Sequence, residues 1–524
     1  MPKVPSVLPL AAPPADALTP RLSALSALLA THQDRDALAL AEALVAEHPR
    51  AGAAWSLLGV AAQRHGLSAR ALQAHQAAVQ WLPDHAGVRF NLANALQRDG
   101  DLVQALACLD DAIGLEPNHA PAHNLRGLVL ERLGRIGEAA RAYQRAVQID
   151  PGFVQAHSNL LFMLTHAGDL SPTALTEAHR RFGTMHGEPL RAHWPQHANV
   201  KDPARRLRIG FVSADLRHHA VARFIAPLWR AWDREAFELV AYATHPRADA
   251  MTRQLQPLVD QWHDVSALDD AALARRIQAD GVDVLFDLGG HTAHHRLMCF
   301  ARKPAPLQIT AIGYPHTTGL VAMDYRITDA FRTPPHMAAQ HVEQLVWIPS
   351  ASTFEHGASP DPAPLPSLSG APFTFGSFQR PSKIGDASLD LWGAVLRAVP
   401  QGRLLLGGVD AAAPRERLQQ ALAARGVAPE RLQFHGTLPM NDYLQLHARI
   451  DLLLDTVPYP AGTTAHHGLW MGVPTLTRTG PSIVSWQCAG ILGRLGLGAF
   501  IAHDDATFVA LAQSWSRQPA ALAD

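Results

Sequence analysis

The pattern of apolar and polar positions divides the chain into two halves of different character. Up to about residue 206, apolar positions recur with helical spacing in short segments separated by turns. From Leu207 onward, short apolar runs such as RIGFVS (208–213) alternate with amphipathic stretches such as VARFIAPLWRAW. Buried strands interleaved with helices are typical of a parallel sheet covered on both faces. We therefore predict an α-helical half followed by an α/β half.

Small residues mark a strict period in the helical half. Four columns keep an interval of 34 residues: Gly66, Gly100, Gly134 and Gly168; Pro49, Pro83, Pro117 and Pro151; Ala37, Ala71, Ala105 and Ala139; and Ala78, Ala112 and Ala146, with Leu44 one period earlier. The glycines permit a tight turn, the alanines let paired helices approach closely, and the prolines stop the second helix. This period and pattern predict tetratricopeptide repeats.

The repeats are expected to stack into a superhelix. Full repeats run over about 51–84, 85–118 and 119–152. A repeat that matches the pattern less well precedes them, and a helix pair opens at Phe153. The concave face of such a superhelix usually holds peptides or proteins, and pure scaffolding or dimerisation is the alternative. One more helix is expected from Ser171, as its N-cap, with Pro172 in the first turn.

The α/β half contains two similar groups of strands, which predict two doubly wound, Rossmann-like domains. The expected strands are 208–213, 237–244, 282–289, 307–314 and 345–349 in the first group, and 373–378, 403–409, 431–436, 451–457 and 474–479 in the second. Two such sheets in tandem leave a ligand cleft at the carboxyl ends of their strands. The predicted domains are a disordered tail (1–16), repeats (17–170), a helical linker (171–206), the first α/β domain (207–350), a linker (351–372) and the second α/β domain (373–524).

Composition narrows the function classes. The chain has 524 residues, 48% of them hydrophobic, and a formal net charge of -1, so neither nucleic acid nor a membrane surface is expected as a partner. The apolar runs are shorter than the ~18 residues of a membrane helix, and the proline-broken N-terminus does not resemble a signal peptide. Three scattered cysteines, Cys108, Cys299 and Cys488, suit a reducing cytosol. Without HExxH or CxxC motifs, no metal site is predicted.

Polar loops follow three strands of the first α/β domain. In VSADLRHHAVARF, Asp215 and His219 are four residues apart, so the carboxylate is able to orient an imidazole that acts as a general base. The alternative, favoured by spacing alone, is a helix-capping aspartate beside exposed histidines. The loop DLGGHTAHHRL (287–297) is expected to direct His291 and Thr292 toward the same cleft. With the turn IGYPHTTG (312–319), the three loops are expected to form one wall of a pocket, or else to be ordinary surface loops.

Two loops of the second α/β domain favour an anionic ligand. In SFQRPSKIGDASLDLW, Gln379, Arg380 and Lys383 precede a helix that begins near Asp386, and a cation beside a helix N-terminus suits phosphate. A solvated lysine is the alternative. In PYPAGTTAHHGLWMGVP, the segment Gly462–Thr464 is expected where a strand turns into a helix, with hydroxyls and N–H groups facing an anion. No Walker lysine or GxGxxG is present, which excludes a P-loop or dinucleotide fingerprint.

These motifs, in this order, resemble the O-GlcNAc transferase / SPINDLY family. The similarity runs from about residue 20 to the end and rests on the repeats followed by VSADLRHH, GHTAHHRL, RKPAPLQ, IGYPHTTG, MDYRITD, FTFGSFQRPSKI, LDTVPYPAGTT and LWMGVP. It implies a GT-B architecture of two Rossmann-like domains, with the nucleotide sugar bound mainly to the second. It also implies inverting, metal-independent transfer of GlcNAc from UDP-GlcNAc to Ser/Thr of intracellular proteins, without a cofactor. The only Asp-x-Asp triplets, 34–36 and 99–101, lie in repeat turns and are consistent with this.

The resemblance also implies roles for individual residues. His219 matches a family histidine proposed as base or sugar contact; His218 is adjacent, and His179 in EAHRRFG resembles another proposed base. Lys383 matches a phosphate-binding lysine that would stabilise the leaving UDP. The remaining matches are Thr463 and Thr464 for the diphosphate, Leu438 and Tyr443 for uracil, and Gly313 and Pro315 for the sugar pocket.

Some positions depart from the family pattern. His467 stands where relatives carry Asp or Glu for the ribose hydroxyls, Arg380 replaces a polar amide, and Met440 stands where lysine is common. The asparagine column expected inside the superhelix is present only at Asn91 and Asn159. Two further hypotheses therefore stay open: a SPINDLY-like protein O-fucosyltransferase that uses GDP-fucose, and a catalytically weak repeat scaffold. The expected partners are a nucleotide sugar and protein acceptors held by the superhelix, in the cytoplasm.

Overall fold

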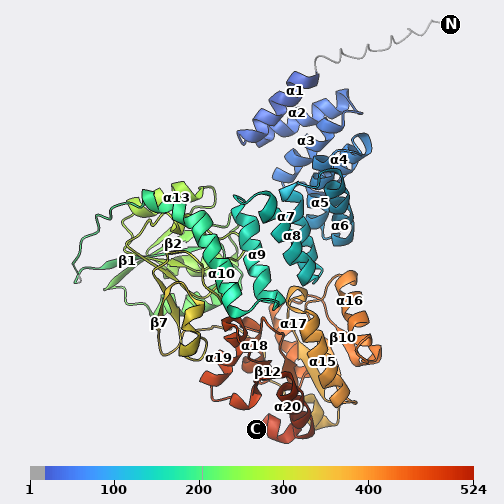
Figure 1. Cartoon of the computed structure of the whole chain (residues 1–524), viewed down its shortest axis with the longest axis vertical. Helices are drawn as coiled ribbons and strands as arrows, with labels where there is room; N and C mark the ends of the chain where they lie inside the picture. The colour runs from blue at the N-terminus through green and yellow to red at the C-terminus, as the bar shows by residue number, and fades with distance from the viewer. Residues whose placement is uncertain (1–17, 203) are drawn as a thin grey trace, which may run out of the picture. The chain divides into compact units, whose positions relative to one another are not determined.

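The computed structural model describes residues 18–202 and 204–524, which form two compact units (Figure 1). One unit ends at Leu130 and the other runs from Glu131 to Asp524. The tail predicted over 1–16 lies outside the described residues. None of the helices in the described ranges has both the length and the apolar character needed to cross a bilayer.

Helical hairpins make up the first part of the chain, as the 34-residue period predicted. The helices are α1 (Leu18–Ala30), α2 (Asp34–Glu47), α3 (Gly52–Arg64), α4 (Ser68–Trp81), α5 (Ala86–Asp99), α6 (Leu102–Leu115), α7 (Ala120–Arg132), α8 (Ile136–Ile149), α9 (Val154–Ala167) and α10 (Pro172–Phe182). The four column glycines lie in the turns with φ between 73 and 98°, a region that favours glycine. The column alanines are buried between helices, and Ser171 caps α10 by accepting a hydrogen bond from the N–H of Ala174.

The first α/β domain contains a parallel sheet of seven strands in the order β3-β2-β1-β4-β5-β6-β7. Its elements are β1 (Leu207–Ser213), α11 (Ala220–Ala231), β2 (Phe237–Ala243), α12 (Ala250–Leu255), β3 (Gln261–Asp264), α13 (Asp270–Ala279), β4 (Val284–Asp287), α14 (Leu297–Phe300), β5 (Leu307–Thr310), β6 (Tyr325–Thr328) and β7 (Gln344–Trp347). The prediction omitted β3 and β6, which are four residues long and rich in polar side chains.

The second α/β domain contains a parallel sheet of six strands in the order β10-β9-β8-β11-β12-β13. Its elements are β8 (Thr374–Ser377), α15 (Asp386–Ala398), β9 (Arg403–Leu406), α16 (Ala412–Ala423), β10 (Leu432–Phe434), α17 (Met440–Gln445), β11 (Leu452–Leu454), α18 (Thr463–Trp470), β12 (Thr475–Arg478), α19 (Gln487–Arg494), β13 (Ile501–Ala502), α20 (Asp505–Arg517) and α21 (Pro519–Ala523). The prediction omitted the two-residue strand β13. The predicted fold class, helical repeats followed by two doubly wound domains, is confirmed.

Helices α9 and α10 share a hydrophobic core with the first sheet. Alternate residues of β1 and β2 face opposite sides, so Phe211 packs with α11 residues such as Trp229, whereas Val212 packs with Leu161 of α9 and Phe182 of α10. The end of α10 comes so close to the loop after β5 that a Cβ on Gly183 would lie 1.8 Å from the carbonyl oxygen of Gly319. The last helix pair of the repeat pattern is thus built into the α/β domain.

Each sheet has one point where the strand order reverses, between β1 and β4 in the first and between β8 and β11 in the second. Ligands of open α/β sheets bind outside the carboxyl ends of the strands at such points. The motifs VSADLRHH, DLGGHT, SFQRPSK and DTVPYPAGTT directly follow these four strands. The topology therefore places the candidate residues where ligand binding is expected.

Candidate active site

A buried carboxylate holds the loop that follows β11. Asp455 accepts hydrogen bonds from the N–H of Thr456 at 2.9 Å, the N–H of Ala461 at 2.7 Å and the hydroxyl of Thr477 at 2.7 Å. Burial raises the pKa of Asp455, and these hydrogen bonds oppose that rise. The indole N–H of Trp392 donates to the carbonyl of Asp455 at 2.9 Å. Both ends of segment 456–461 are therefore fixed before the chain enters α18.

The start of α18 is arranged to receive an anion. Gly462 is the N-cap residue and Thr463 opens the helix, as predicted. A Cβ on Gly462 would meet no atom within 4 Å, so the space in front of the helix stays open. The first N–H groups of a helix have no partner within it and carry its positive dipole end. Gln379, at the end of β8, donates to the hydroxyl of Thr464 at 2.7 Å and joins the two switch-point loops.

Lys383 lies beside this helix start. Its ammonium donates to the carbonyl of Pro460 at 3.0 Å and lies 4.6 Å from the ring centroid of Tyr459. Burial lowers the pKa of Lys383 to about 7; the positive charge of Arg380 acts in the same direction, and Asp455 opposes both. Since the carbonyl and the ring are neutral partners, the ammonium is left to pair with an anionic ligand. We call Lys383, Tyr459, Gly462, Thr463 and Thr464 the anion grip.

The structure adds a residue that the sequence prediction missed. His166, on α9, stacks on Tyr459 at a centroid distance of 4.0 Å. Its Nδ1 donates to the carbonyl of Phe162 at 2.9 Å, so Nε2 carries the lone pair of the neutral ring. Nε2 is buried and has no hydrogen-bond partner among the described residues. Burial lowers the pKa of His166 to about 3, and the charges of Lys383 and Arg380 add to this.

One signal for His166 was present in the repeat pattern. At the position two residues before the turn glycine, the three preceding repeats carry Arg64, Arg98 and Arg132. His166 is therefore a break in an arginine column at the last repeat.

The predicted pair Asp215 and His219 is present, although the segment between them is not helical. His219 is the extended N-cap residue of α11, and its Nδ1 accepts a hydrogen bond from the N–H of Val221 at 3.3 Å. The same nitrogen lies 3.5 Å from a carboxylate oxygen of Asp215, and the side chain of His219 is 42% exposed. Burial lowers the pKa of His219, and Asp215 opposes this shift. With Nδ1 as an acceptor, the neutral ring carries its proton on Nε2. Only the tautomer protonated on Nδ1, toward Asp215, leaves a lone pair on Nε2 for a reacting group.

His218 and His179 are placed differently from His219. His218 is exposed, and its backbone N–H donates to the carboxylate of Asp249 at 2.7 Å. His179 has no exposed surface; its Nδ1 donates to the carbonyl of Leu175 and its Nε2 accepts from the hydroxyl of Tyr314, both at 2.7 Å. Burial lowers the pKa of His179 to about 4. Because both ring nitrogens of His179 form hydrogen bonds inside the core, the geometry argues against the prediction that His179 is the base.

The prediction that His291 faces the cleft is wrong. The side chain is 1% exposed and lies in the core against α9, where Nδ1 is 3.0 Å from the hydroxyl of Ser158 and Nε2 donates to the carbonyl of Thr318 at 2.9 Å. The preceding Gly290 has φ of 56°, and a Cβ there would lie 2.3 Å from Tyr314. This left-handed turn, possible because residue 290 is glycine, sends the next side chain inward.

The residues predicted to hold the base of the nucleotide lie in the second domain. The ring of Tyr443, on α17, packs edge-on against Phe378, His447 and His467. Its hydroxyl lies 3.2 Å from Nδ1 of His467. His467 is buried, and burial lowers its pKa to about 3, so it is neutral near pH 7. Leu438 is 36% exposed in the loop before α17.

The two residues predicted to line a sugar pocket are close-packed. A Cβ on Gly313 would lie 2.0 Å from the carbonyl oxygen of Leu288, so only glycine fits between β4 and β5 at this point. Pro315 is buried and lines a cavity of about 200 Å³ in the first α/β domain. Arg380, by contrast, is exposed beside the anion grip.

Comparison with known proteins agrees with this architecture. The family model described as "Glycosyl transferase family 41" matches residues 151–358 and 367–523, and a tetratricopeptide repeat model matches 23–86 and 90–152. A variant of the Thermobaculum terrenum O-GlcNAc transferase is 34% identical and has a TM-score of 0.82, with 90% of each chain covered.

Plant proteins are also similar in sequence. The protein named "Probable UDP-N-acetylglucosamine--peptide N-acetylglucosaminyltransferase SPINDLY" from Petunia hybrida is 35% identical over 366 residues, which are 68% of this chain and 39% of that protein. The corresponding SEC protein of Arabidopsis thaliana is 31% identical over 284 residues, 52% of this chain and 29% of that protein. The chain thus spans about two-fifths of the length of the SPINDLY relatives it matches. Because the family model covers most of the chain and the folds agree, the protein belongs to glycosyltransferase family 41.

Proposed function

We propose that this protein transfers GlcNAc from UDP-GlcNAc to serine or threonine of protein acceptors, with inversion and without a metal. The observation that carries the proposal is Lys383, an ammonium whose partners are a carbonyl and an aromatic ring, placed beside the open start of α18. An ammonium beside a helix N-terminus suits the diphosphate of a nucleotide sugar. The names of the similar plant and Thermobaculum proteins support GlcNAc as the sugar.

The proposed reaction uses both domains. The acceptor oxygen forms a bond to C1 of the sugar while the bond from C1 to the diphosphate oxygen breaks, and its electron pair leaves with UDP. Lys383, with the N–H groups and hydroxyls of Thr463 and Thr464, stabilises the negative charge that develops on the leaving group. For Nε2 of His219 to take the proton of the acceptor hydroxyl, the neutral ring carries its own proton on Nδ1, 3.5 Å from Asp215, whose carboxylate stabilises the imidazolium that results.

The first test is nucleotide binding. We expect UDP to bind the full chain in isothermal titration calorimetry, Lys383→Ala to weaken binding at least tenfold, and Lys201→Ala, at an exposed lysine, to leave it unchanged. Absence of UDP binding, or equal affinity of Lys383→Ala, would contradict the proposal and favour the scaffold hypothesis.

The second test identifies the donor. A thermal-shift panel of UDP-, GDP- and dTDP-sugars should show stabilisation by UDP-GlcNAc above the others. Mass spectrometry of an incubated acceptor protein should then show addition of an N-acetylhexosamine. Stabilisation by GDP-fucose and addition of a deoxyhexose would instead support the SPINDLY-like alternative.

A further inference from the structure

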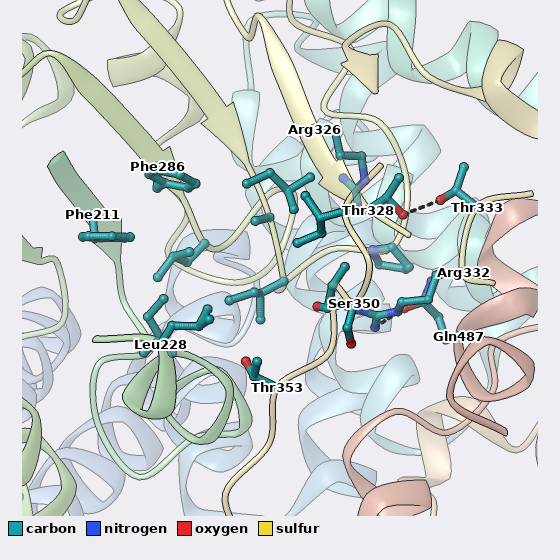
Figure 2. A pocket seen from close by; sticks show the side chains of 18 of the residues that line it. Phe211, Leu228, Phe286, Arg326, Thr328, Arg332, Thr333, Ser350, Thr353 and Gln487 are labelled. Atoms are coloured by element: carbon teal, nitrogen blue, oxygen red, sulfur yellow. Dashed lines mark hydrogen bonds between the residues drawn. The ribbon is translucent and has the colours of Figure 1, made fainter. Parts of the chain in front are cut away.

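A cavity lies at the carboxyl ends of the first sheet, and Gln487 of the second α/β domain closes one side of it. It has a volume of about 200 Å³ and lies between the first sheet, α11 and the segment 348–353 that leads toward the second domain (Figure 2). The helix contributes Ile225, Leu228 and Trp232, and strands β1 and β4 contribute Phe211 and Phe286. The anion grip does not line this cavity, whereas Pro315, which the family resemblance predicts for the sugar pocket, does.

The cavity is polarised from one end to the other. Figure 2 shows the apolar side chains of Phe211, Phe286 and Leu228 on one side, and Arg332 with Gln487 on the opposite side. Apolar cavities of this size in proteins stay dry and accept apolar molecules. The apolar end therefore suits a hydrocarbon group, which gains free energy for each methylene removed from water.

The polar end of the cavity contains the guanidinium of Arg332, which forms no direct ion pair with a carboxylate of the described residues. One terminal nitrogen donates to the side-chain oxygen of Gln487 at 2.8 Å and the other to the carbonyl of Ala351 at 3.4 Å. Its Nε is buried and has no hydrogen-bond partner among the described residues. The nearby carboxylate of Asp329 accepts from the backbone N–H groups of Phe331, Arg332 and Ala351. The guanidinium is thus available to a carboxylate.

We propose that this cavity binds an amphipathic monocarboxylate, with its hydrocarbon chain among Phe211, Phe286 and Leu228 and its carboxylate on Arg332. Charge and polarity together select this ligand class. A neutral hydrocarbon would leave the guanidinium of Arg332 without a direct counterion, and a cationic head would meet it with like charge.

Calorimetry on the full chain tests the proposal, with decanoate as the probe and decyltrimethylammonium as the same chain with a cationic head. We expect saturable binding of one decanoate and at least tenfold weaker binding of the cation. Arg332→Gln and the cavity-filling Leu228→Trp should each weaken decanoate binding at least tenfold. Ala311→Leu fills the same cavity and replaces Leu228→Trp if that variant does not fold.

Two control variants lie outside the cavity lining. Arg230→Gln removes an exposed arginine of α11, and Val346→Trp adds an indole at an exposed position of β7; both should keep wild-type decanoate affinity. The proposal is overturned if decanoate shows no saturable binding, if both head groups bind equally, or if the cavity variants retain full affinity. Displacement of decanoate by UDP would also overturn it, because it would place the probe in the anion grip.

Discussion

The hydroxyl of Thr477 on β12 donates a 2.7 Å hydrogen bond to the carboxylate of Asp455 at the end of β11. The first domain repeats this arrangement: Thr310 on β5 donates at 2.8 Å to Asp287, the last residue of β4. Asp287 also accepts from the N–H groups of Gly289 and Gly290, as Asp455 does from its own loop. In both sheets a buried carboxylate at the switch point thus sets the path of the loop that faces the cleft.

Removing the charge of Asp455 should loosen the anion grip. In Asp455→Asn, one oxygen becomes an NH₂ group that faces the donors of Ala461, Thr456 or Thr477, and each buried donor left without an acceptor costs about 1–3 kcal/mol. We expect a lower melting temperature and at least tenfold weaker UDP binding by calorimetry. Thr477→Val removes one donor of the three and should have the smaller effect.

Asp451→Asn is the matched control for this prediction. Asp451 is equally buried and accepts from the backbone N–H groups of Ser367 and Thr374, away from the loop that leads to α18. It should lower the melting temperature but leave UDP affinity near the wild-type value. Equal loss of affinity in both variants would show that Asp455 acts only through general stability.

The lowered pKa of Lys383 predicts proton uptake when UDP binds. With a pKa of about 7 in the free protein, most Lys383 side chains are neutral at pH 8. A bound diphosphate favours the charged form and raises this pKa, so binding at pH 8 should take up close to one proton. Below pH 6 the side chain is already charged, and uptake through Lys383 should vanish. Calorimetry in buffers of different ionisation enthalpy measures the proton count.

Variants at two lysines separate this effect from other titrating groups. Lys383→Met should show no uptake at pH 8, and Lys201→Met, at an exposed position, should show the wild-type value. Uptake that survives in Lys383→Met would assign the proton to another group and contradict the prediction.

His219 and His179 should respond in opposite ways to substitution by alanine. His219→Ala removes a 42%-exposed side chain, so the melting temperature should change little while kcat at saturating donor falls by about 10²–10⁴. His179→Ala opens a hole in the core and leaves the hydroxyl of Tyr314 without its partner, so the melting temperature should fall. Its kcat, measured well below the melting temperature, should fall far less.

Transfer rates and thermal melts on the same two variants decide between the histidines. Equal, small losses of kcat would mean that neither is the base and would direct attention to the lone pair of His166. A collapse of kcat in a well-folded His179→Ala would contradict its assignment to the core.

The repeat half was the most predictable part of the fold. The 34-residue period is visible in the sequence because the structure requires a small residue at fixed positions of each repeat. Gly66 and Gly100 have positive φ, and Ala37 is closely packed between helices. Strands β1 and β2 were predicted to within one residue, whereas the predicted ends of β5, β9 and β11 ran three or four residues too far. Short strands such as β3 were missed, because only their position beside β2 makes them strands.

The candidate site could be predicted only where a residue's direction follows from local structure. Thr463 and Thr464 open a helix at a strand end, so their N–H groups point outward by the geometry of the helix itself. His291 also lies in a loop that follows a strand, but its side chain points into the core. The positive φ of Gly290 and the contact with Ser158, 133 positions earlier, cause this direction. His166 reaches the anion grip through a contact with Tyr459, which is even farther away along the chain. Neither contact can be inferred from local spacing, and for His166 the sequence offers only the break in the arginine column of the repeats.

Because the end of α10 lies close to the loop after β5, we expect alanine at Gly183 to lower stability, although this substitution normally raises the stability of a helix. In a helix this change normally stabilises by up to about 1 kcal/mol. Gly183 has helical φ and ψ, yet a Cβ there would lie 1.8 Å from the carbonyl oxygen of Gly319, so Gly183→Ala should destabilise by about 1–3 kcal/mol. In Gly137→Ala on α8 the nearest atom is the end of the Arg141 side chain at 3.6 Å, and the melting temperature should stay level or rise. Thermal melts that shift both variants in the same direction would contradict the backbone contact.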